Sequence, residues 1–498
     1  MSKKQDKEKI KLSEKLALNF RKKWLVSGIQ TFLKVAILIM GYISLNLFVR
    51  QLDLPQIDVT ENKLYTLTDA SKNAVSKIDK EVTVYAYGFE EDSTLIDLMK
   101  QYKAVNDKIS YEILTEESNF EMVQSYGLSS GYYVLIIKSG DSEKLIDAST
   151  QFSSYDYVTN QTIDTTEQVI TNSMLALIEE NKPKIYFTQG HGEYDTSIAL
   201  TLESQLTNEA YEHEYLNIAT RGGIPEDCDV LAIISPSSDF LDAEVAAISD
   251  YINKGGDIYY AMDVVSQEVS YINLQKVLDQ YGVSIQNGYI FELANNQQLA
   301  EYPYIFMPQA SSTHEITRDI YTDSYMWLVY AGRLNFKSDA ELQALNATKE
   351  ILLSSTEEAL FVTELQADMT QALTTAKASK CDVAAAITKK VTPPGASEET
   401  ESKLVVISSG NFMADFKMNN LNQSYPMSYI GSNMDFAINS MAFLAGKDNL
   451  LTIRKEYNSS TYTPTNIQNL VVVLVIIFVP ILIIATGIII GAWRKRRK

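Results

Sequence analysis

The sequence predicts an α/β protein in which two extracytoplasmic α/β domains lie between two transmembrane helices. Three observations lead to this prediction. Short runs of β-branched and aromatic residues alternate with amphipathic segments and with turns rich in glycine or proline, which is typical of sheets covered by helices. A long apolar segment lies near each end of the chain. The length of 498 residues exceeds one ordinary hydrophobic core, so we expect more than one folded domain.

Composition narrows the classes of function. The net charge is -20, but the first 50 residues and the last few are basic, so the acidic residues are concentrated in the middle. An acidic middle repels phosphate backbones, and we expect no nucleic-acid partner. The two cysteines, Cys228 and Cys381, either pair or are both buried thiols, and we favour buried thiols. With only three histidines, we expect no metal site and no cofactor.

The two apolar segments, Leu25–Val49 and Leu470–Trp493, are each long enough to be predicted as transmembrane helices. Lys34 either snorkels to the headgroups or precedes a shorter apolar span. A cleaved signal peptide fits poorly, because no small-residue cleavage site follows. Basic residues flank both segments on their terminal sides, so the positive-inside rule predicts a two-pass protein of the plasma membrane. Both termini would be cytoplasmic, residues 51–466 would lie outside, and the lipid bilayer would be a partner.

Residues 58–163 are predicted as the first external domain. Thr68 or Asp69 is expected to cap its first helix. A strand, a helix and a second strand then indicate a parallel crossover, to which a third strand can add, and this pattern is similar to the thioredoxin type. The turn after the first strand holds no cysteine, which excludes dithiol chemistry and leaves a scaffold role. The predicted strands are 81–87, 108–114 and 132–138, and the helix between the first two is 93–105.

A connecting helix at 164–181 leads to the second domain, residues 182–455, and a linker at 456–469 follows it. Regular alternation of strands and helices predicts a doubly wound α/β domain with a mostly parallel sheet. Residues 291–380 are less periodic and are expected to be an insertion or an elaborated lobe. The predicted strands are 184–188, 213–218, 229–235, 257–262, 382–391 and 403–408, and the helices are 197–209, 242–253, 271–281 and 435–444.

The candidate site is Gly190-His191-Gly192-Glu193, followed by Asp195, directly after the first strand of the second domain. Polar side chains at the carboxyl end of a strand are where open α/β sheets bind ligands. His191 and Glu193 could act as a general base pair, or could bind a sugar or peptide. Alternatively, His191 bridges the loop and the glycines serve the turn, or the loop docks a partner. We favour the structural or docking interpretation and assign no catalytic residue.

The remaining candidates for chemistry are weak. His213 lies between two glutamates in a strand and is expected to be solvated, and His314 lies in the irregular lobe without a second ligand. Cys228 precedes a strand and lies between Asp227 and Asp229, whose charges would raise the pKa of its thiol. It is therefore a poor nucleophile.

Several pieces of the chain match one family in order. The chain resembles the GldG-like family, auxiliary components of ABC-type transport systems, over nearly its whole length except the lobe at 291–380. The resemblance implies that the second domain is shaped like a class I glutamine amidotransferase and works beside an ABC-2-type permease and a cytoplasmic ATPase. The matching pieces are the two apolar segments, Glu167-Gln168 before the strand that ends in Gly190-His191-Gly192-Glu193, and Ile224–Leu231 with Ser235-Pro236, Glu244 and Gly255-Gly256.

The sequence contains no Gly-x-x-x-x-Gly-Lys-Ser/Thr phosphate loop, so this chain is not expected to hydrolyse ATP with such a loop. A partner subunit would have to supply that activity. We therefore expect a non-enzymatic, membrane-anchored auxiliary subunit of an ABC-2-type export system. Its external domain would contact substrate or envelope components, and movement of the permease would be transmitted through the two anchors. The alternatives are a surface receptor or sensor for a glycan or peptide and a hydrolase that uses His191 and Glu193.

Overall fold

The computed structural model describes most of the folded part of the chain. The described residues are 29–30, 32–44, 66–156, 161–179, 182–264, 269–294, 297–299, 302–318, 320, 326–363, 373–415 and 426–446, with a few single residues and short runs between 477 and 493. The chain divides into two units, Met1–Val59 and Thr60–Lys498. In the first unit, residues 29–30 and 32–44 are helical, and their large apolar side chains are exposed, Phe32 at 73% and Leu38 at 74%.

The prediction of flanking transmembrane helices is wrong. Among the described residues, no helix combines the length and the apolar character needed to cross a membrane. A span requires about 20 consecutive apolar helical residues, and the helical residues at 29–30 and 32–44 fall short of that. Leu25, Val49 and Leu470, which bounded the predicted spans, lie outside the described residues, whereas Trp493 is exposed. The predicted fold class and two-pass localisation are corrected accordingly: the structure is a mixed α/β protein with several sheets.

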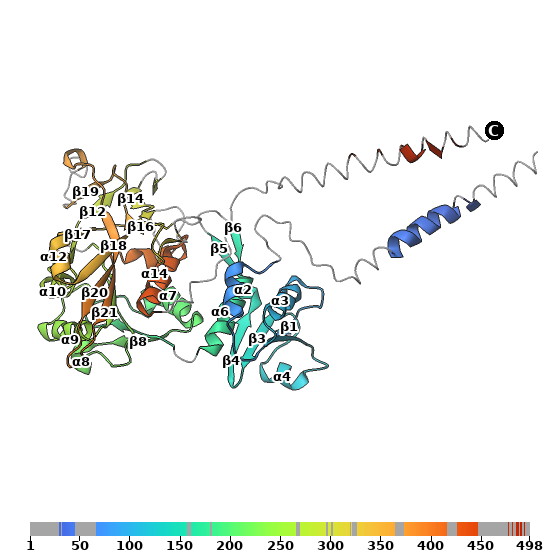
Figure 1. Ribbon diagram of the computed structural model, residues 1–498, viewed down its shortest axis with the longest axis horizontal. Helices are drawn as coiled ribbons and strands as arrows, with labels where there is room; N and C mark the ends of the chain where they lie inside the picture. Colours follow the sequence, from blue (N-terminus) through green and yellow to red (C-terminus); the bar gives the residue numbers. More distant parts are fainter. Residues whose placement is uncertain are drawn as a thin grey trace, which may run out of the picture. The chain divides into compact units, whose positions relative to one another are not determined.

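The chain from residue 66 to 179 builds a four-stranded sheet in the order β2-β1-β3-β4 (Figure 1). β1 is parallel to β2 and antiparallel to β3, so the predicted crossover is confirmed. Thr68, one of the two predicted caps, accepts a hydrogen bond from the backbone N–H of Ser71 at the start of α2. The elements are α2 (Asp69–Val75), β1 (Val82–Tyr87), α3 (Thr94–Val105), β2 (Ile109–Leu114), α4 (Phe120–Ser125), β3 (Val134–Ser139), β4 (Ser142–Asp147), α5 (Ala148–Gln151), β5 (Ser153–Asp156), β6 (Gln161–Asp164) and α6 (Thr166–Ile178).

An eight-stranded sheet organises residues 182–446, in the order β15-β18-β20-β21-β10-β9-β7-β8. The five strands from β21 to β8 are parallel, and the other three are antiparallel. The main elements are β7 (Lys184–Thr188), α7 (Thr196–Asn208), β8 (Glu212–Leu216), α8 (Ile218–Arg221), β9 (Val230–Ile234), α9 (Asp242–Asn253), β10 (Asp257–Ala261), α10 (Ile272–Asp279), β15 (Gln309–Ala310), β18 (Ala347–Ser354), β20 (Asp382–Val391), β21 (Thr400–Ile407) and α14 (Asn433–Leu444).

Residues 291–380, predicted to be an insertion or an elaborated lobe, supply β15 and β18 to this sheet. The other strands of this stretch form small antiparallel sheets, either with one another or with β11 (Val283–Gln286) and β12 (Tyr289–Phe291), which begin before it. The other smaller elements are β13 (Gln298–Leu299), β14 (Tyr302–Phe306), β16 (Leu328–Val329), β17 (Arg333–Phe336), α12 (Asp339–Ala344), β19 (Leu360–Val362), η1 (Asn411–Met413) and η2 (Met427–Tyr429).

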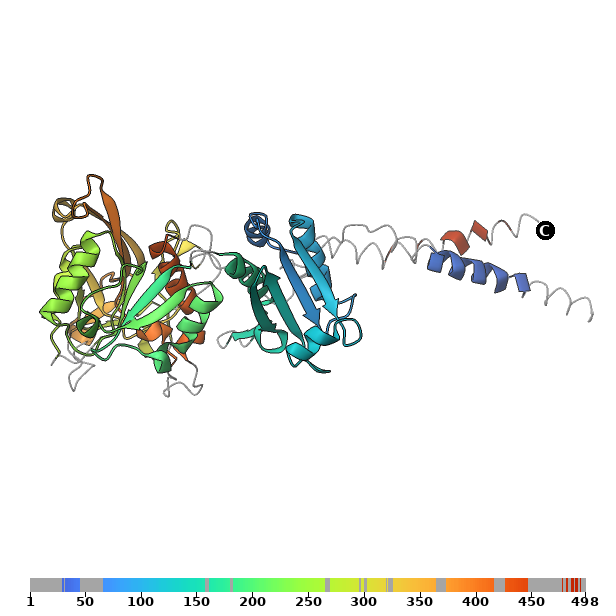
Figure 2. The same ribbon diagram turned by 90° about the horizontal axis from the view of Figure 1, so that it is seen from below.

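Helices cover both faces of the eight-stranded sheet, as Figure 2 shows. Successive side chains of a strand point to opposite faces, and β9 is buried on both. Val230, Ala232 and Ile234 pack into the cluster that holds the apolar residues of α7 and α14. Leu231 and Ile233 pack into the opposite cluster, with those of α9 and α10. This two-sided burial explains the continuous apolar run of β9.

The strand order creates a switch point between β7 and β9. From β7 the chain first adds β8 on one side and then crosses back to add β9 on the other side of β7. The loops that leave the carboxyl ends of β7 and β9 therefore diverge to opposite faces. A crevice at such a point is where open α/β sheets bind ligands.

Candidate functional site

The loop Gly190-His191-Gly192-Glu193 leaves the carboxyl end of β7 at this switch point. Gly190 has φ +123° and Gly192 has φ +77°, values that favour glycine. A Cβ on Gly190 would lie 2.6 Å from Asn217 Nδ2, and one on Gly192 would overlap Ser237 Oγ. Both glycines are thus required by the turn and by close neighbours.

The backbone of this loop is tied to the loop that follows β9. The His191 carbonyl accepts hydrogen bonds from the N–H groups of Ser237, at 2.8 Å, and Ser238, at 3.0 Å. Three residues farther on, the Tyr194 N–H donates to the Ile234 carbonyl at 3.1 Å. These bonds join the ends of β7 and β9 across the switch point.

The side chain of His191 turns inward and bridges the loop to α9. Its Nε2 lies 2.9 Å from Glu244 Oε2, its Nδ1 lies 3.5 Å from Glu193 Oε1, and its ring stacks on Phe240 with 4.1 Å between centroids. The side chains of Glu193 and Glu244 are each 2% exposed and that of His191 is 12% exposed. We refer to His191, Glu193, Glu244 and Phe240 as the histidine clamp. Its geometry supports the structural interpretation of the loop, since little of these side chains reaches solvent.

Asp195, the last predicted site residue, caps a helix. It is exposed, and it accepts hydrogen bonds from the backbone N–H of Ser197, at 2.9 Å, and from the Ser197 hydroxyl. Both bonds lower the pKa of the Asp195 carboxyl. Asp195 thus fixes the start of α7 and is not part of the histidine clamp.

A second group of polar side chains, which sequence reasoning missed, joins the ends of four parallel strands. Asp263 follows β10, and its Oδ1 accepts the N–H groups of Gly410 and Asn411, both at 2.8 Å, from the end of β21. The Tyr194 hydroxyl donates to Asp263 Oδ2 at 2.5 Å and also lies 3.0 Å from Asn411 Oδ1. Burial and the Asp263 charge raise the pKa of Tyr194 far above its usual value, so the hydroxyl stays protonated. With Ser235 these residues form what we call the Asp263 cluster.

Ser235, directly after β9, completes this cluster. It has φ +48°, is 7% exposed, and packs against Gly410. Its hydroxyl lies near that of Tyr194, but within the described part of the chain Ser235 Oγ is buried without a hydrogen-bond partner. Ser235 is the last residue of the strand predicted at 229–235, and Asp263 and Asn411 come shortly after the strands predicted at 257–262 and 403–408. These positions at strand ends are the signal that could have found them.

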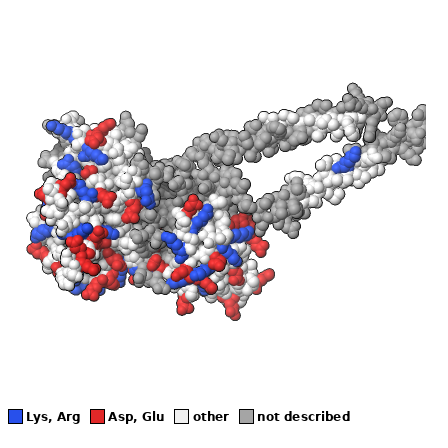
Figure 3. All heavy atoms as spheres, in the orientation of Figure 1, with Lys and Arg blue, Asp and Glu red and all other residues white. Residues whose placement is uncertain are grey.

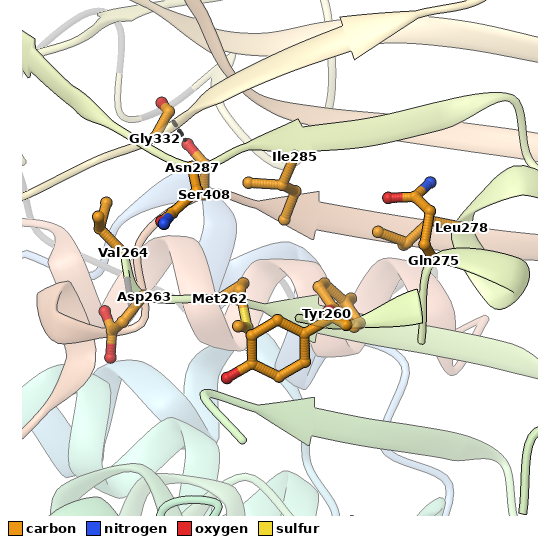
Figure 4. Close-up of a pocket in the computed structure, with 11 residues that line it drawn as sticks. Tyr260, Met262, Asp263, Val264, Gln275, Leu278, Ile285, Asn287, Gly332 and Ser408 are labelled. Carbon is orange, nitrogen blue, oxygen red and sulfur yellow. Dashed lines mark hydrogen bonds between the residues drawn. The ribbon is translucent and has the colours of Figure 1, made fainter. Parts of the chain in front are cut away.

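A cavity of about 60 Å³ opens beside the Asp263 cluster (Figure 4). Tyr260, Met262 and Asp263 lie along one side of it, and Ile285, Asn287 and Ser408 lie across from them. Four of these residues, Tyr260, Met262, Asp263 and Ser408, lie at or directly after the carboxyl ends of β10 and β21. The cavity therefore lies at the same edge of the sheet as the histidine clamp and the Asp263 cluster.

The opposite edge of the sheet, at the amino ends of the parallel strands, carries several acidic side chains. Lys184 at the start of β7 pairs with Glu214, at 2.7 Å, and with Asp227, at 3.0 Å. These partners raise the pKa of Lys184. Figure 3 shows acidic side chains gathered near this end, around the position of α8 and β8 in Figure 1.

The cysteines and the other histidines show no catalytic arrangement. Cys228 and Cys381 are both free, which rules out their pairing, and burial raises the pKa of Cys228 to about 12. His213 is 22% exposed and lies 3.6 Å from Glu203 Oε2, so this histidine, expected to be solvated, is only partly exposed to solvent. His314 is buried and accepts a hydrogen bond from the Ile316 N–H at 3.2 Å. In the described ranges, no group of three His, Cys, Asp or Glu side chains could hold a metal ion.

Comparison of the sequence with protein families gives a match over the domain that carries this site. The model of the family described as an ABC-type uncharacterized transport system matches residues 182–440, more than half of the chain. The chain belongs to this family. Its role is that of an auxiliary component of an ABC transport system. The match identifies an ABC transport auxiliary family, but it does not identify the GldG-like family within it. A domain of unknown function matches residues 61–133.

Solved structures resemble the chain only loosely. The mmIFT52 N-terminal domain is 14% identical with a TM-score of 0.37, over 52% of this chain and 97% of that one. A putative ThuA-like protein from Parabacteroides merdae is 8% identical with a TM-score of 0.34, over 57% of this chain and 98% of that one. A glutamine amidotransferase from Thermotoga maritima is 10% identical with a TM-score of 0.21, over 35% and 68%. No curated protein matches the sequence.

Proposed function

We propose that this chain is a non-enzymatic, non-ATPase subunit of a GldG-like, ABC-2-type export system, and that it binds a permease and a cytoplasmic ATPase. The observation that carries the proposal is the family match over residues 182–440. The sequence adds a second argument. Because it contains no phosphate loop of the Walker type, the energy for transport comes from a partner that has one.

The geometry of the candidate site supports a binding role over a catalytic one. A general base must reach the proton that it abstracts, but the imidazole of His191 is held between two carboxylates that are each 2% exposed. A nucleophile must be accessible and easily deprotonated, whereas burial raises the pKa of the Cys228 thiol to about 12. The histidine clamp is better suited to hold a loop in one conformation.

The helix at residues 29–30 and 32–44 supports a partner contact. Its apolar side chains are exposed around the helix, among them Phe32, Ile37 and Leu38. A contiguous apolar surface of this kind on a folded chain marks a site of interaction, because leaving it in water is costly. We assign this helix to contact with a subunit of the transporter.

Copurification tests the proposal. The full chain, expressed with its transporter subunits and extracted gently in detergent, is expected to retain the permease and the ATPase, and only the complex should hydrolyse ATP. Replacing Phe32 and Leu38 by Ser should release the partners. Phe120→Ser removes an equally exposed apolar side chain from α4 and should leave the complex intact. Recovery of the wild-type chain without either partner, or ATP hydrolysis by the chain alone, would contradict the proposal.

A further inference from the structure

We propose that the cavity beside Asp263 binds a small organic cation, a ligand that carries a protonated amine. This inference goes beyond the proposed function and does not depend on it, because it concerns a small molecule in the second domain and not a partner subunit. It rests on the position of the cavity and on the charge of its wall.

The position is that of a ligand site. The cavity lies at the carboxyl ends of β10 and β21, where loops from several parallel strands converge. Its volume of about 60 Å³ exceeds that of a single ordered water and admits a group of a few heavy atoms. Met262 and Ile285 supply apolar surface from opposite sides of it, which suits the hydrocarbon part of such a ligand.

The negative charge on the cavity wall favours a cationic ligand. The Asp263 carboxylate is half-buried, and in the described part of the chain neither Lys nor Arg forms an ion pair with it. A carboxylate offers about four acceptor positions, and three are taken by neutral donors, the N–H groups of Gly410 and Asn411 and the hydroxyl of Tyr194. One acceptor position and the negative charge are left for a ligand. The described lining contains no basic residue that could hold an anion.

The donors of an ammonium group also fit what the wall leaves open. Ser235 packs directly against Gly410 and is not among the residues that line the cavity, so the ligand would reach the Asp263 carboxylate and not the Ser235 hydroxyl. An ammonium group has three donors and no acceptor. It can therefore fill the remaining acceptor position of Asp263, which neither a carboxylate nor a phosphate ligand can do.

Titration of the purified full chain with n-propylammonium tests this assignment, with saturation-transfer NMR to detect bound ligand. We expect saturable binding with a dissociation constant in the millimolar range, about what a ligand of so few heavy atoms can reach. Propionate, which has nearly the same shape and the opposite charge, should not bind. Asp263→Asn keeps the size and one oxygen acceptor and should weaken propylammonium binding at least about tenfold.

Asp250→Asn is the matched control, because it makes the same charge change on the exposed surface of α9 and should leave binding unchanged. Ile285→Phe fills the cavity without touching the charge and should also abolish binding. It keeps the test decisive if Asp263→Asn does not fold. Absence of saturable binding, equal binding of propionate, or undiminished binding in both Asp263→Asn and Ile285→Phe overturns the inference. None of these results bears on copurification with the transporter.

Discussion

The histidine clamp predicts an unusually large loss of stability for Glu244→Ala. Glu244 Oε2 accepts a hydrogen bond from the backbone N–H of Leu241 at 2.8 Å and lies 2.9 Å from His191 Nε2. The hydrogen bond caps α9, and losing such a bond costs about 1 kcal/mol. The contact with His191 is a buried polar pair, whose loss costs about 1.5–3 kcal/mol. Together we expect a loss of about 3 kcal/mol in the free energy of unfolding.

Glu341→Ala provides the matched control. Glu341 occupies the same third position of a helix, α12, and accepts the backbone N–H of the capping residue Ser338 at 2.9 Å. It is exposed, has no histidine partner in the described structure, and also accepts the Ser338 hydroxyl at 2.6 Å, so its replacement shows the effect of losing a complete capping box. The difference between the two variants therefore measures the contact with His191.

Urea and thermal unfolding followed by tryptophan fluorescence provide the assay, because Trp327 lies partly buried in the same domain. For a domain of this size, 3 kcal/mol corresponds to a fall of about 6–12 °C in the unfolding midpoint. Glu244→Gln retains an acceptor for both donors and should recover much of the loss. If Glu244→Ala destabilises the domain no more than Glu341→Ala does, His191 is not held by Glu244 and the clamp is refuted.

Two further predictions concern single residues. Gly192→Ala should lower the free energy of unfolding by about 3 kcal/mol, because the alanine must adopt a left-handed backbone and its Cβ would overlap Ser237. Gly395→Ala also places an alanine at a positive φ, +82°, but in open space, and should lower the free energy of unfolding in urea by only about 1 kcal/mol. Equal losses of stability in the two variants would show that Ser237 moves aside freely. Burial raises the pKa of the Asp257 carboxyl to about 7, so the folded state binds the carboxyl proton more tightly than the unfolded state does. The free energy of unfolding should therefore fall as the pH rises from about 4 to about 7. Asp257→Asn should flatten that dependence in unfolding measured at pH 5 and pH 8, and an unchanged slope would contradict the assignment.

Elements with strong local signals were predictable from the sequence. The helix predicted at 242–253 is α9 with the same bounds, because Asp242 and Glu244 fill its first turn and Gly255 ends it. The strand predicted at 184–188 is β7, whose apolar run is buried. In both cases the residues that decide the element lie within it or directly beside it.

The strand β18 shows why the lobe at 291–380 could not be predicted. Its first half, Ala347–Ile351, carries polar side chains at an edge of the sheet, and its pairing with β20 shifts register near Leu353. An irregular register breaks the alternation of apolar and polar residues on which strand prediction depends. The strand is identified only by its partner β20, about 30 residues farther along the chain.

The candidate site, too, could be predicted only in part from the sequence. The sequence drew attention to His191 because glycines flank it, but the partner that fixes its side chain, Glu244, is more than 50 residues away, and no local pattern reveals that contact. The Asp263 cluster is still more dispersed, since the Asp263 carboxylate joins Tyr194 and Gly410 from strand ends separated by 69 and 147 residues. What the sequence does supply is the position of these polar residues after buried strands. Parallel pairing then brings such residues to one edge, so the location of a binding site follows from the fold class, whereas its chemistry follows from which side chains meet there.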